Sequence, residues 1–589
     1  MNILNYIKEI VVHALNEVYA SSFTPKELTI NETKENFNGD YTLVTFSLAK
    51  ELKTSPPEIA QRLGEKLMEN HTVFKNFEVV QGFLNFSLQN QLFISQLEKN
   101  FEQAEINLAS TSQKVMIEFA SPNTNKPIHF GHLRNIFLGD SLSNIMTAAG
   151  NNVIKANLIN DRGIHICKSM IAWQLFANGD TPESTNIKGD HFVGDYYVKF
   201  NEVYKKEISE LVSSGMSEKE AEKEAPIFKS AQEMLRKWEA GDEEILALWK
   251  KMNGWVYVGF DETFKKLHVE FDKMYYESNT YLKGKEIVLE AKKENLLLQK
   301  DDTSIWIDLT ADGLDEKILL RSDGTSVYIT QDIGTAEIKY NDFKIDQSIY
   351  VIGDEQNYHM QVLKLALKKM NKSYADGIFH LSYGMVELPS GKMKSREGNV
   401  VDADDMIAEM KQIAQQNTEE KGKVEHFSIE ELQQLYDTIG LGALKFYLLR
   451  VDPKKKMIFN PKESIDMHGF TAPFIQYCHA RLFSILSKCE VSKIDLSTYE
   501  ITETEKKLVK NLAQFQHVIA QASQEHNPSL ICNYTFQLAQ ETNGFLTSHS
   551  VLKADTELEK QFRLQLCMYS KNTIKTAMQL LGINVPDRM

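Results

Sequence analysis

The clearest hydrophobic pattern along the chain is a short apolar run followed by apolar positions at helical spacing. Residues 115–120 form a mostly apolar run of strand length, and a loop with two prolines and two asparagines follows it. The pattern predicts a strand, a loop and a helix that ends near Gly150. The loop would bring the end of the strand next to the free backbone N–H groups at the start of the helix, and these groups favour an anion. The periodic apolar positions are Leu133, Ile136, Phe137, Ile145 and Met146.

The rest of the pattern divides the chain into three parts. Residues 1–105 mix helices with alternating strands and predict an α+β module, in which Ser55 caps a helix. Residues 106–400 alternate strands and helices, which predicts a Rossmann-type parallel sheet with ligands at the carboxyl ends of its strands. Charged helices at about 179–267 indicate a helical insertion in that sheet. Residues 401–589 predict an all-α bundle, so the fold class is multidomain α/β.

Three local expectations concern the parallel-sheet region. Asp161 precedes a helical stretch and is expected to cap it. Residues 304–309 are expected to return to the main sheet. Asp323-Gly324 predicts a hairpin turn between two strands, the second of which ends near Tyr328.

Length and composition narrow the class of protein. A chain of 589 residues is too long for one core, so three or four domains are expected. The five cysteines are scattered without a Cys-x-x-Cys pair, which argues against a structural zinc and for reduced thiols in a cytoplasm. No apolar run is long enough for a bilayer, and the start lacks a signal-peptide layout. The net charge of −15 argues against indiscriminate nucleic-acid binding but allows a local basic face.

The loop before the predicted helix is the strongest candidate for chemistry. No Asp or Glu occurs from Phe119 to Gly139, whereas Lys126, Arg134 and two histidines do. A phosphate site needs that local positive charge. His129 and His132 lie on one side of a helix start, where both can donate to phosphate oxygens. The alternatives are a metal-binding pair or two histidines that cap the helix.

A second basic loop lies at residues 388–400. Gly391 and Gly398 flank the basic run from Lys392 to Arg396. Such a loop can close over a triphosphate. A solvated basic surface loop is the alternative.

Polar and aromatic residues next to predicted strands form a third candidate site. A cationic guanidinium needs carboxylates and amide acceptors in a fixed plane, together with an aromatic wall. Taken singly, each residue is also compatible with a loop-packing role. The five residues are Glu118, Asn123, Tyr328, Asp332 and Gln356.

The two basic loops carry a family resemblance. His129-Phe-Gly-His132 resembles the His-Ile-Gly-His signature of class I aminoacyl-tRNA synthetases, and its flanks from Glu118 to Arg134 are similar to those of arginyl-tRNA synthetases. Residues 388–400 resemble the second, Lys-Met-Ser-Lys-Ser signature, with Ser395 where the class has its second lysine. The resemblance implies that Lys126 supplies that charge instead.

The resemblance implies a reaction and a set of site residues. Arginine would be activated with ATP and Mg²⁺ and transferred to tRNA(Arg), with neither a resident metal nor a structural zinc. Phosphate charge would be stabilised by His129, His132, Lys126, Lys392 and Lys394. The residues expected at ATP are Pro127, Gly131, Gly353, His359, Met385, Val386, Met393, Ser395 and Arg396. Those expected at arginine are Glu118, Ser121, Asn123, His129, Tyr328, Asp332 and Gln356.

The resemblance extends to both ends of the chain. It implies that residues 1–105 contact the tRNA elbow and that residues 401–589 contact the stem and read the anticodon. A monomer in the cytoplasm, with no membrane partner, is expected. Activation in arginyl-tRNA synthetases waits for tRNA, and the same is expected here.

Two other interpretations stay open from the sequence. A different class I enzyme, such as a cysteine-specific synthetase or a small adenylyltransferase, is opposed by the missing zinc cysteines and the long helical C-terminus. A non-catalytic RNA-binding paralogue is supported only by the imperfect second signature. Intact His129, His132 and Lys126 oppose it.

Overall fold

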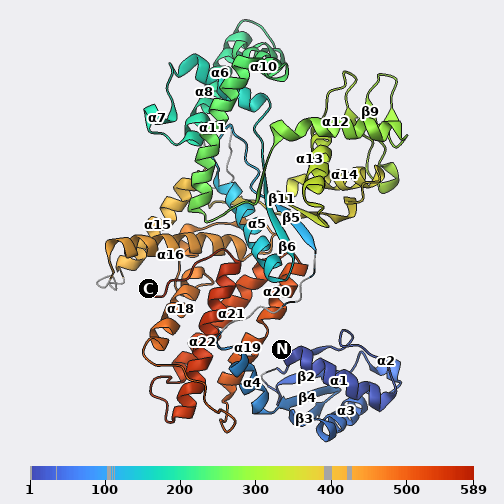
Figure 1. The fold of residues 1–589 in the computed structure, drawn as a ribbon, viewed down its shortest axis with the longest axis vertical. Helices are drawn as coiled ribbons and strands as arrows, with labels where there is room; N and C mark the ends of the chain where they lie inside the picture. Colours follow the sequence, from blue (N-terminus) through green and yellow to red (C-terminus); the bar gives the residue numbers. More distant parts are fainter. Residues whose placement is uncertain are drawn as a thin grey trace.

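The structure is a computed structural model that describes residues 3–34, 36–102, 108, 111, 113–389, 401–420 and 427–589. Figure 1 shows a central sheet with a helical insertion above it and a smaller mixed region beside it. A helical bundle lies below and meets the N-terminal module. Among the described residues, no helix is both long enough and apolar enough to cross a membrane.

Five parallel strands form the central sheet, in the order β12-β11-β5-β6-β7. Ile117 of β5 lies in register between Lys155 of β6 and Ile349 of β11. The chain order reverses between β5 and β11, and ligands of such sheets bind at that point, beyond the carboxyl ends of the strands. The bounds are β5 Lys114–Glu118, β6 Asn152–Ile159, β7 Lys273–Tyr276, β11 Gln347–Gly353 and β12 Ile378–Tyr383.

Helix α5, Phe130–Ala148, follows β5 and lies at the centre of the molecule (Figure 1). Every residue from Leu133 to Ser143 is buried. The helix packs on β6 and β11 and, among the bundle helices, mainly on three. Since it is covered all round, apolar positions occur on all of its faces. The bundle helices are α16 Ile429–Leu449, α20 Phe515–Gln524 and α22 Glu557–Leu580.

The helical insertion runs from Pro182 to Lys266, between β6 and β7, and packs on α6. Helices α8 and α11 cross so closely that a Cβ on Gly189 would collide with the backbone of Trp255. The bounds are α6 Ile164–Phe176, α7 Pro182–Thr185, α8 Gly189–Ser213, α9 Glu218–Glu224, α10 Pro226–Glu239 and α11 Glu243–Lys266.

The mixed region beside the sheet contains a small antiparallel sheet of its own, in the order β10-β9-β8. The prediction that residues 304–309 return to the main sheet is therefore wrong. The bounds are α12 Glu277–Lys293, β8 Leu298–Gln299, β9 Ile305–Ile307, η1 Thr310–Asp312, β10 Lys317–Leu320, α13 Tyr328–Phe343, η2 Asp354–Gln356, α14 Asn357–Lys369 and η3 Ala375–Gly377.

The hairpin predicted at Asp323-Gly324 is also wrong in its second half. The turn is followed by an isolated bridge at Ser326, and α13 then begins at Tyr328. Packing explains the difference, since α12 and α13 lie so close that a Cβ on Gly284 would collide with the carbonyl of Thr330. Tertiary contact thus overrides the strand preference of this stretch.

The N-terminal module has four antiparallel strands in the order β1-β2-β4-β3. Ser55 does precede α3, although its side chain makes no capping hydrogen bond. The module attaches to the bundle through α4 and through Asp40, which is 3% exposed and pairs with Lys506 at 3.5 Å and Lys510 at 2.8 Å. The bounds are α1 Ile3–Tyr19, β1 Ile30–Glu32, β2 Tyr41–Val44, α2 Ala49–Leu52, α3 Pro56–Asn70, β3 Phe74–Val80, β4 Phe83–Leu88 and α4 Asn90–Asn100.

The C-terminal part is a helical bundle, as predicted. A short parallel pair, β13 with β14, joins its base to the catalytic region. The predicted fold class, with an α+β module, a parallel sheet and an all-α bundle, is confirmed. The remaining bounds are β13 Val386–Glu387, α15 Ala403–Glu420, β14 Met457–Ile458, α17 Pro461–Ser464, α18 Ala472–Leu486, α19 Glu503–Ala513 and α21 Ser529–Ser548.

Candidate active site

Two imidazoles stand at the start of α5. His129 immediately precedes the helix, and His132 lies in its first turn. The ring centroids are 3.8 Å apart, and the backbone N–H of His129 donates to Nδ1 of His132 at 3.2 Å. A neutral His132 therefore carries its proton on Nε2, where it can donate to a ligand. The ring thus caps the helix with one nitrogen and leaves the other to donate.

Burial keeps both rings uncharged at neutral pH. It lowers the pKa of His129 to about 4, with the charge of Lys126 as a further cause. It lowers the pKa of His132 well below the usual range, with His129 and Lys126 as smaller causes. The pKa of Lys126 is lowered by burial as well. Nδ1 of His129 is buried without a hydrogen-bond partner in the part of the chain that the structure describes.

The backbone between β5 and these histidines is strained. Ala120 and Ser121 have φ angles of 72° and 45°, in the left-handed region that residues with a side chain rarely adopt. The N–H of Ala120 donates to Oδ1 of Asn135 at 2.6 Å, and that of Ser121 donates to Oδ1 of Asn157 at 3.0 Å. Two buried amides thus hold the loop in place, and strain of this kind gathers at functional sites.

Two neighbouring pockets open at the end of the sheet. One, of about 540 Å³, lies where the strand order reverses between β5 and β11. The other, of about 710 Å³, contains Asn123 and Lys126 and shares Asn160, Tyr328 and Asp332 with the first. Some of the residues predicted for each substrate therefore line the same pocket. Those in the smaller pocket are Glu118, Ser121, His132, Tyr328, Asp332, Gly353, Gln356 and His359.

Apart from Asn123 and Lys126 in the larger pocket, the other predicted residues line neither pocket or lie outside the described part of the chain. Pro127 and Gly131 flank His129 in the loop and the first turn of α5. Val386 lies in β13, directly after Met385. The predicted residues of the second signature, Lys392, Met393, Lys394, Ser395 and Arg396, lie outside the described residues.

Glu118 already has a partner inside the protein. It is the last residue of β5, is 5% exposed, and forms an ion pair with the fully buried Lys339 of α13. The ammonium of Lys339 also lies 4.3 Å from the ring centroid of Tyr350. The pairing meets the need of a buried charge for a counter-charge. A substrate cation at Glu118 would have to share this carboxylate with Lys339.

Asp332 also has an internal partner, but a more accessible one. Nε2 of His359 lies 2.5 Å from Oδ2 of Asp332, and this hydrogen bond raises the pKa of His359 against the effect of burial. The side chain of Asp332 remains 37% exposed. Its carboxylate can therefore meet a ligand from the pocket.

Comparison with known proteins identifies the family. The family model "tRNA synthetases class I (R), catalytic domain" matches residues 94–460, well over half of the chain. The chain belongs to the arginyl-tRNA synthetases. Models of the arginyl-tRNA synthetase N-terminal domain and of the DALR anticodon binding domain match residues 5–88 and 475–589. The family predicted from the two signatures is confirmed.

Individual relatives cover the chain from end to end. It is 48% identical over 587 residues to the arginine–tRNA ligase of Bacteroides thetaiotaomicron, and the match covers 98% of each chain. The solved arginyl-tRNA synthetase of Thermus thermophilus matches with a TM-score of 0.82 at 25% identity, over 100% of both chains. The arginyl-tRNA synthetase of Plasmodium falciparum matches with a TM-score of 0.77 at 19% identity, over 100% of this chain and 99% of its own. The last likeness concerns the fold alone.

Two sequence expectations in this synthetase need correction. Asp161 does not cap α6, because its carboxylate binds Ser278 through the N–H at 2.9 Å and the hydroxyl at 2.7 Å. Gly163, with a φ of 101°, takes the position before the helix. Arg134 was counted among the local positive charges, yet it is fully buried and donates to the backbone carbonyls of residues 384, 452 and 455. It holds α5 in place and lines neither of the two pockets.

Several site residues were missed in the sequence. The signal was a polar residue inside an apolar element: Asn135 in α5, Asn157 in β6 and Lys339 in α13. Arg162 gave no such signal. Its guanidinium lies 3.9 Å from the ring centroid of Tyr281 in the wall of the larger pocket.

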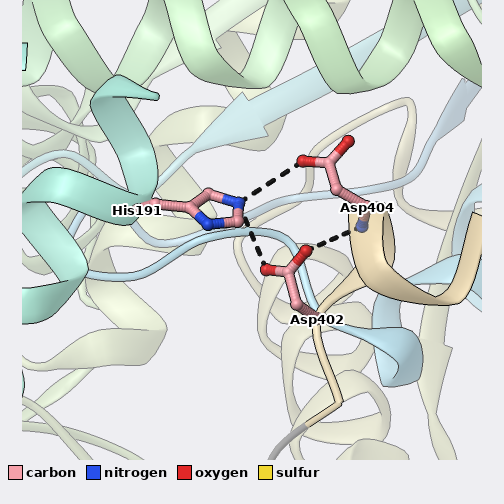
Figure 2. A group of neighbouring side chains, drawn as sticks. All are labelled: His191, Asp402 and Asp404. Atoms are coloured by element: carbon pink, nitrogen blue, oxygen red, sulfur yellow. Dashed lines mark hydrogen bonds and ion pairs between the residues drawn. The ribbon is translucent and has the colours of Figure 1, made fainter. Parts of the chain in front are cut away.

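One cluster near the first signature has the spacing of a cation site. Figure 2 shows His191 of α8 facing Asp402 and Asp404 at the start of α15. Their ligating atoms lie within 4.8 Å of one another. However, Asp404 already pairs with the ammonium groups of Lys188 at 2.7 Å and Lys266 at 2.8 Å. A metal ion would have to join two cations at the same carboxylate, so we interpret the cluster as an ionic network.

Proposed function

We propose that the two neighbouring pockets are where this arginine–tRNA ligase forms arginyl-adenylate and then arginyl-tRNA. In the first step, the carboxylate of arginine attacks the α-phosphorus of ATP and pyrophosphate leaves. In the second step, the terminal adenosine hydroxyl of tRNA(Arg) takes the arginyl group and AMP leaves. Neither step needs a nucleophilic side chain, so the protein contributes positioning and charge stabilisation.

The observation that carries the proposal is the state of the histidines at the start of α5. Burial keeps His129 and His132 neutral, the Nε2 proton of His132 is kept for a ligand, and Lys126 stands beside them. Donors fixed before the reaction need no reorganisation when negative charge builds on the phosphates. The N-terminus of α5 adds its own attraction for an anion.

We assign arginine to the smaller pocket. The carboxylate of Asp332 would pair with the guanidinium, and the ring of Tyr328, which is 79% exposed, would form a wall beside it. Lys339 stays paired with Glu118, and His359 holds the carboxylate of Asp332 until arginine arrives. The other residues assigned to arginine are Glu118, Ser121, Asn123, His129 and Gln356.

We assign ATP to the space between the start of α5 and the end of β11. Mg²⁺ arrives with ATP and neutralises part of the phosphate charge. The residues assigned here are Pro127, Gly131, Gly353, His359, Met385 and Val386, together with Lys392, Met393, Lys394, Ser395 and Arg396 of the second signature. Lys392 and Lys394 would join Lys126 at the phosphates.

We assign tRNA(Arg) to a path along the molecule. The larger pocket adjoins the arginine pocket and is lined by Lys126, Arg162 and Arg321, so it suits the phosphates of the 3′ end. Residues 401–589 would contact the stem and read the anticodon, and residues 1–105 would contact the elbow. The ligase would work as a monomer in the cytoplasm.

ATP–pyrophosphate exchange across a panel of amino acids, each with and without cytoplasmic tRNA, tests this function. Exchange with arginine alone, appearing only when tRNA is added, is the expected result. Exchange with another amino acid would overturn the assignment of the arginine pocket. A folded protein without exchange under any condition would point to the non-catalytic RNA-binding paralogue instead.

A further inference from the structure

The helical insertion touches the loop of the first signature. A Cβ on Gly194 of α8 would come within 2.9 Å of the ring of Pro127. One turn earlier, His191 faces the start of α15 (Figure 2). Three segments that are distant in the chain therefore meet beside Lys126.

An ionic network fills this junction. Nε2 of His191 lies 3.4 Å from a carboxylate oxygen of Asp402 and 3.4 Å from one of Asp404. Lys188 and Lys266 pair with Asp404. Asp402 is bound by neither lysine, and its Oδ2 is buried without a hydrogen bond in the described structure. His191 is thus the cation that faces both carboxylates.

The charge count depends on the state of His191. Asp190, whose side chain is fully buried, pairs with Lys188 at 3.2 Å and brings the carboxylates of the network to three. The two lysines leave one negative charge uncompensated. A protonated imidazole neutralises it, and a neutral one leaves it buried at a cost.

The same junction is joined to the signature by its backbone. Residues 401–403 pair with residues 128–130 through two hydrogen bonds of 2.9 and 3.0 Å. The resulting bridge places Asp402 opposite His129. Oδ1 of Asp402 also accepts the N–H of Asp404 at 2.7 Å, which caps α15. A shift of Asp402 is therefore passed directly to the backbone of His129.

We propose that His191 is a positioning residue for arginine activation, which by bridging Asp402 and Asp404 fixes the segment that carries Lys126 and His129. This inference rests on the proposed function, in which those two residues act on the phosphates. Misplacement by about 1 Å can cost about 10²-fold in rate. Loss of the bridge should therefore lower kcat by a larger factor than it raises the KM for arginine, because His129 is the one residue assigned to arginine within the paired residues 128–130.

The first experiment compares four variants by ATP–pyrophosphate exchange with tRNA present. His191→Gln and Asp404→Asn should lower kcat about tenfold or more at about pH 6.5 and raise the KM for arginine by a clearly smaller factor. Asp405→Asn is the matched control, because it removes a neighbouring carboxylate from the same helical turn, and Asp405 meets the network only through its backbone N–H. It should keep wild-type kcat. His191→Lys, which restores the charge, should recover part of the loss.

The pH profile separates positioning from packing. Asp404 raises the pKa of His191, Asp402 and Asp190 act in the same direction, and burial opposes them. The wild type should therefore lose activity as pH rises through that pKa, so that the deficit of His191→Gln shrinks at high pH. His191→Lys should keep its activity there. The charged groups facing His191 are Lys188, Asp190 and Asp195 on α8, Asp402 and Asp404 at α15, and Lys266 on α11 through Asp404.

Several outcomes would overturn the inference. Wild-type kcat in folded His191→Gln and Asp404→Asn would do so, as would a deficit of equal size at every pH. If His191→Gln does not fold, the comparison of Asp404→Asn with Asp405→Asn decides. If Zn²⁺ without ATP raises the Tm of the wild type but not of His191→Gln, the cluster is a metal site and the ionic network is the wrong interpretation. An inactive wild type would refute the proposed function first, and this inference with it.

Discussion

The cleft at the end of the sheet has two halves, the start of α5 and the pocket that contains Glu118 and Asp332. Their ionisable side chains differ in how their charge is compensated. At the start of α5, burial keeps two histidines neutral. In the pocket that we assign to arginine, both carboxylates keep an internal cation, Lys339 for Glu118 and His359 for Asp332. A site that awaits an anion can stay almost uncharged until the phosphates arrive. A site that binds a cation contains carboxylates, and these need an internal counter-charge before the cation binds.

The arginine half itself contains two kinds of pair. The pair of Glu118 with Lys339 is buried on both sides and therefore permanent. The pair of Asp332 with His359 is about one-third exposed, and its cation titrates. We expect arginine to displace the second partner and to leave the first in place.

The largest expected effect is on the permanent pair. Lys339→Met leaves Glu118 as an uncompensated buried charge, which should lower the free energy of unfolding by about 3–5 kcal/mol. Chemical denaturation measures it. The exposed Lys293→Met is the control and should change little. Adding Glu118→Gln to Lys339→Met should recover much of the loss, and a double variant no more stable than Lys339→Met would contradict the pairing.

The next effect concerns the neutral donors. His132→Ala should cost about 2.7–4 kcal/mol in the activation step, by analogy with the loss of an oxyanion donor. Single-turnover formation of arginyl-adenylate measures this, and thermal unfolding checks that α5 remains intact. His468→Ala, at an exposed histidine, is the control. A full-rate His132→Ala enzyme would refute the role given to this half of the cleft.

A smaller effect is expected from the exchangeable carboxylate. Asp332→Asn should weaken arginine binding by about 1.5–3 kcal/mol, the usual value of a hydrogen bond to a charged group. The KM for arginine should therefore rise while the KM for ATP changes little. Asp312→Asn, at an exposed position in η1, should leave both constants alone. Normal saturation of Asp332→Asn by arginine would show that the guanidinium binds elsewhere.

The smallest effect is the pH dependence of the exchangeable pair. Since Asp332 raises the pKa of His359, the pair contributes its full stability below the usual histidine pKa of about 6.5 and loses it as pH rises through the raised value. The free energies of unfolding of the wild type and His359→Gln should differ by about 0.2–1 kcal/mol at low pH and converge above. Saturating arginine should abolish the difference. A difference that persists with arginine would mean that the guanidinium does not replace His359.

What the sequence revealed was local. The strand, loop and helix from Val115 to Gly150 follow from periodicity and helix-stop signals that act over a few residues, and the structure has them. The two signatures then identified the family. Five residues predicted for arginine also line one pocket. Glu118, Ser121 and Gln356 lie at or just after strand ends that converge at the sheet's edge, whereas Tyr328 and Asp332 come from the start of α13.

What the sequence hid was set by distant partners. Asp161 has the sequence position of a cap, yet Ser278 takes its carboxylate from more than a hundred residues away. Thr330 has a strand-like neighbourhood, yet it is helical because α12 packs on it. The role of Lys339 cannot be told from the local sequence, because its ion pair with Glu118 forms only when α13 is brought next to the end of β5. Propensity describes a segment alone, and these roles exist only after the segments have met.

The buried Asp40 has a consequence for how the molecule is made. Within its own module it accepts the N–H of Leu88 at 2.7 Å, but its ionic partners are Lys506 and Lys510, and the latter comes 470 residues later. At about 5–20 residues per second on the ribosome, these lysines follow Asp40 by roughly half a minute to a minute and a half. The nascent module therefore waits with an unneutralised acid on the surface that will dock the bundle. The N-terminal module is thus synthesised first, but its ion pairs with the bundle form only after Lys506 and Lys510 have been made.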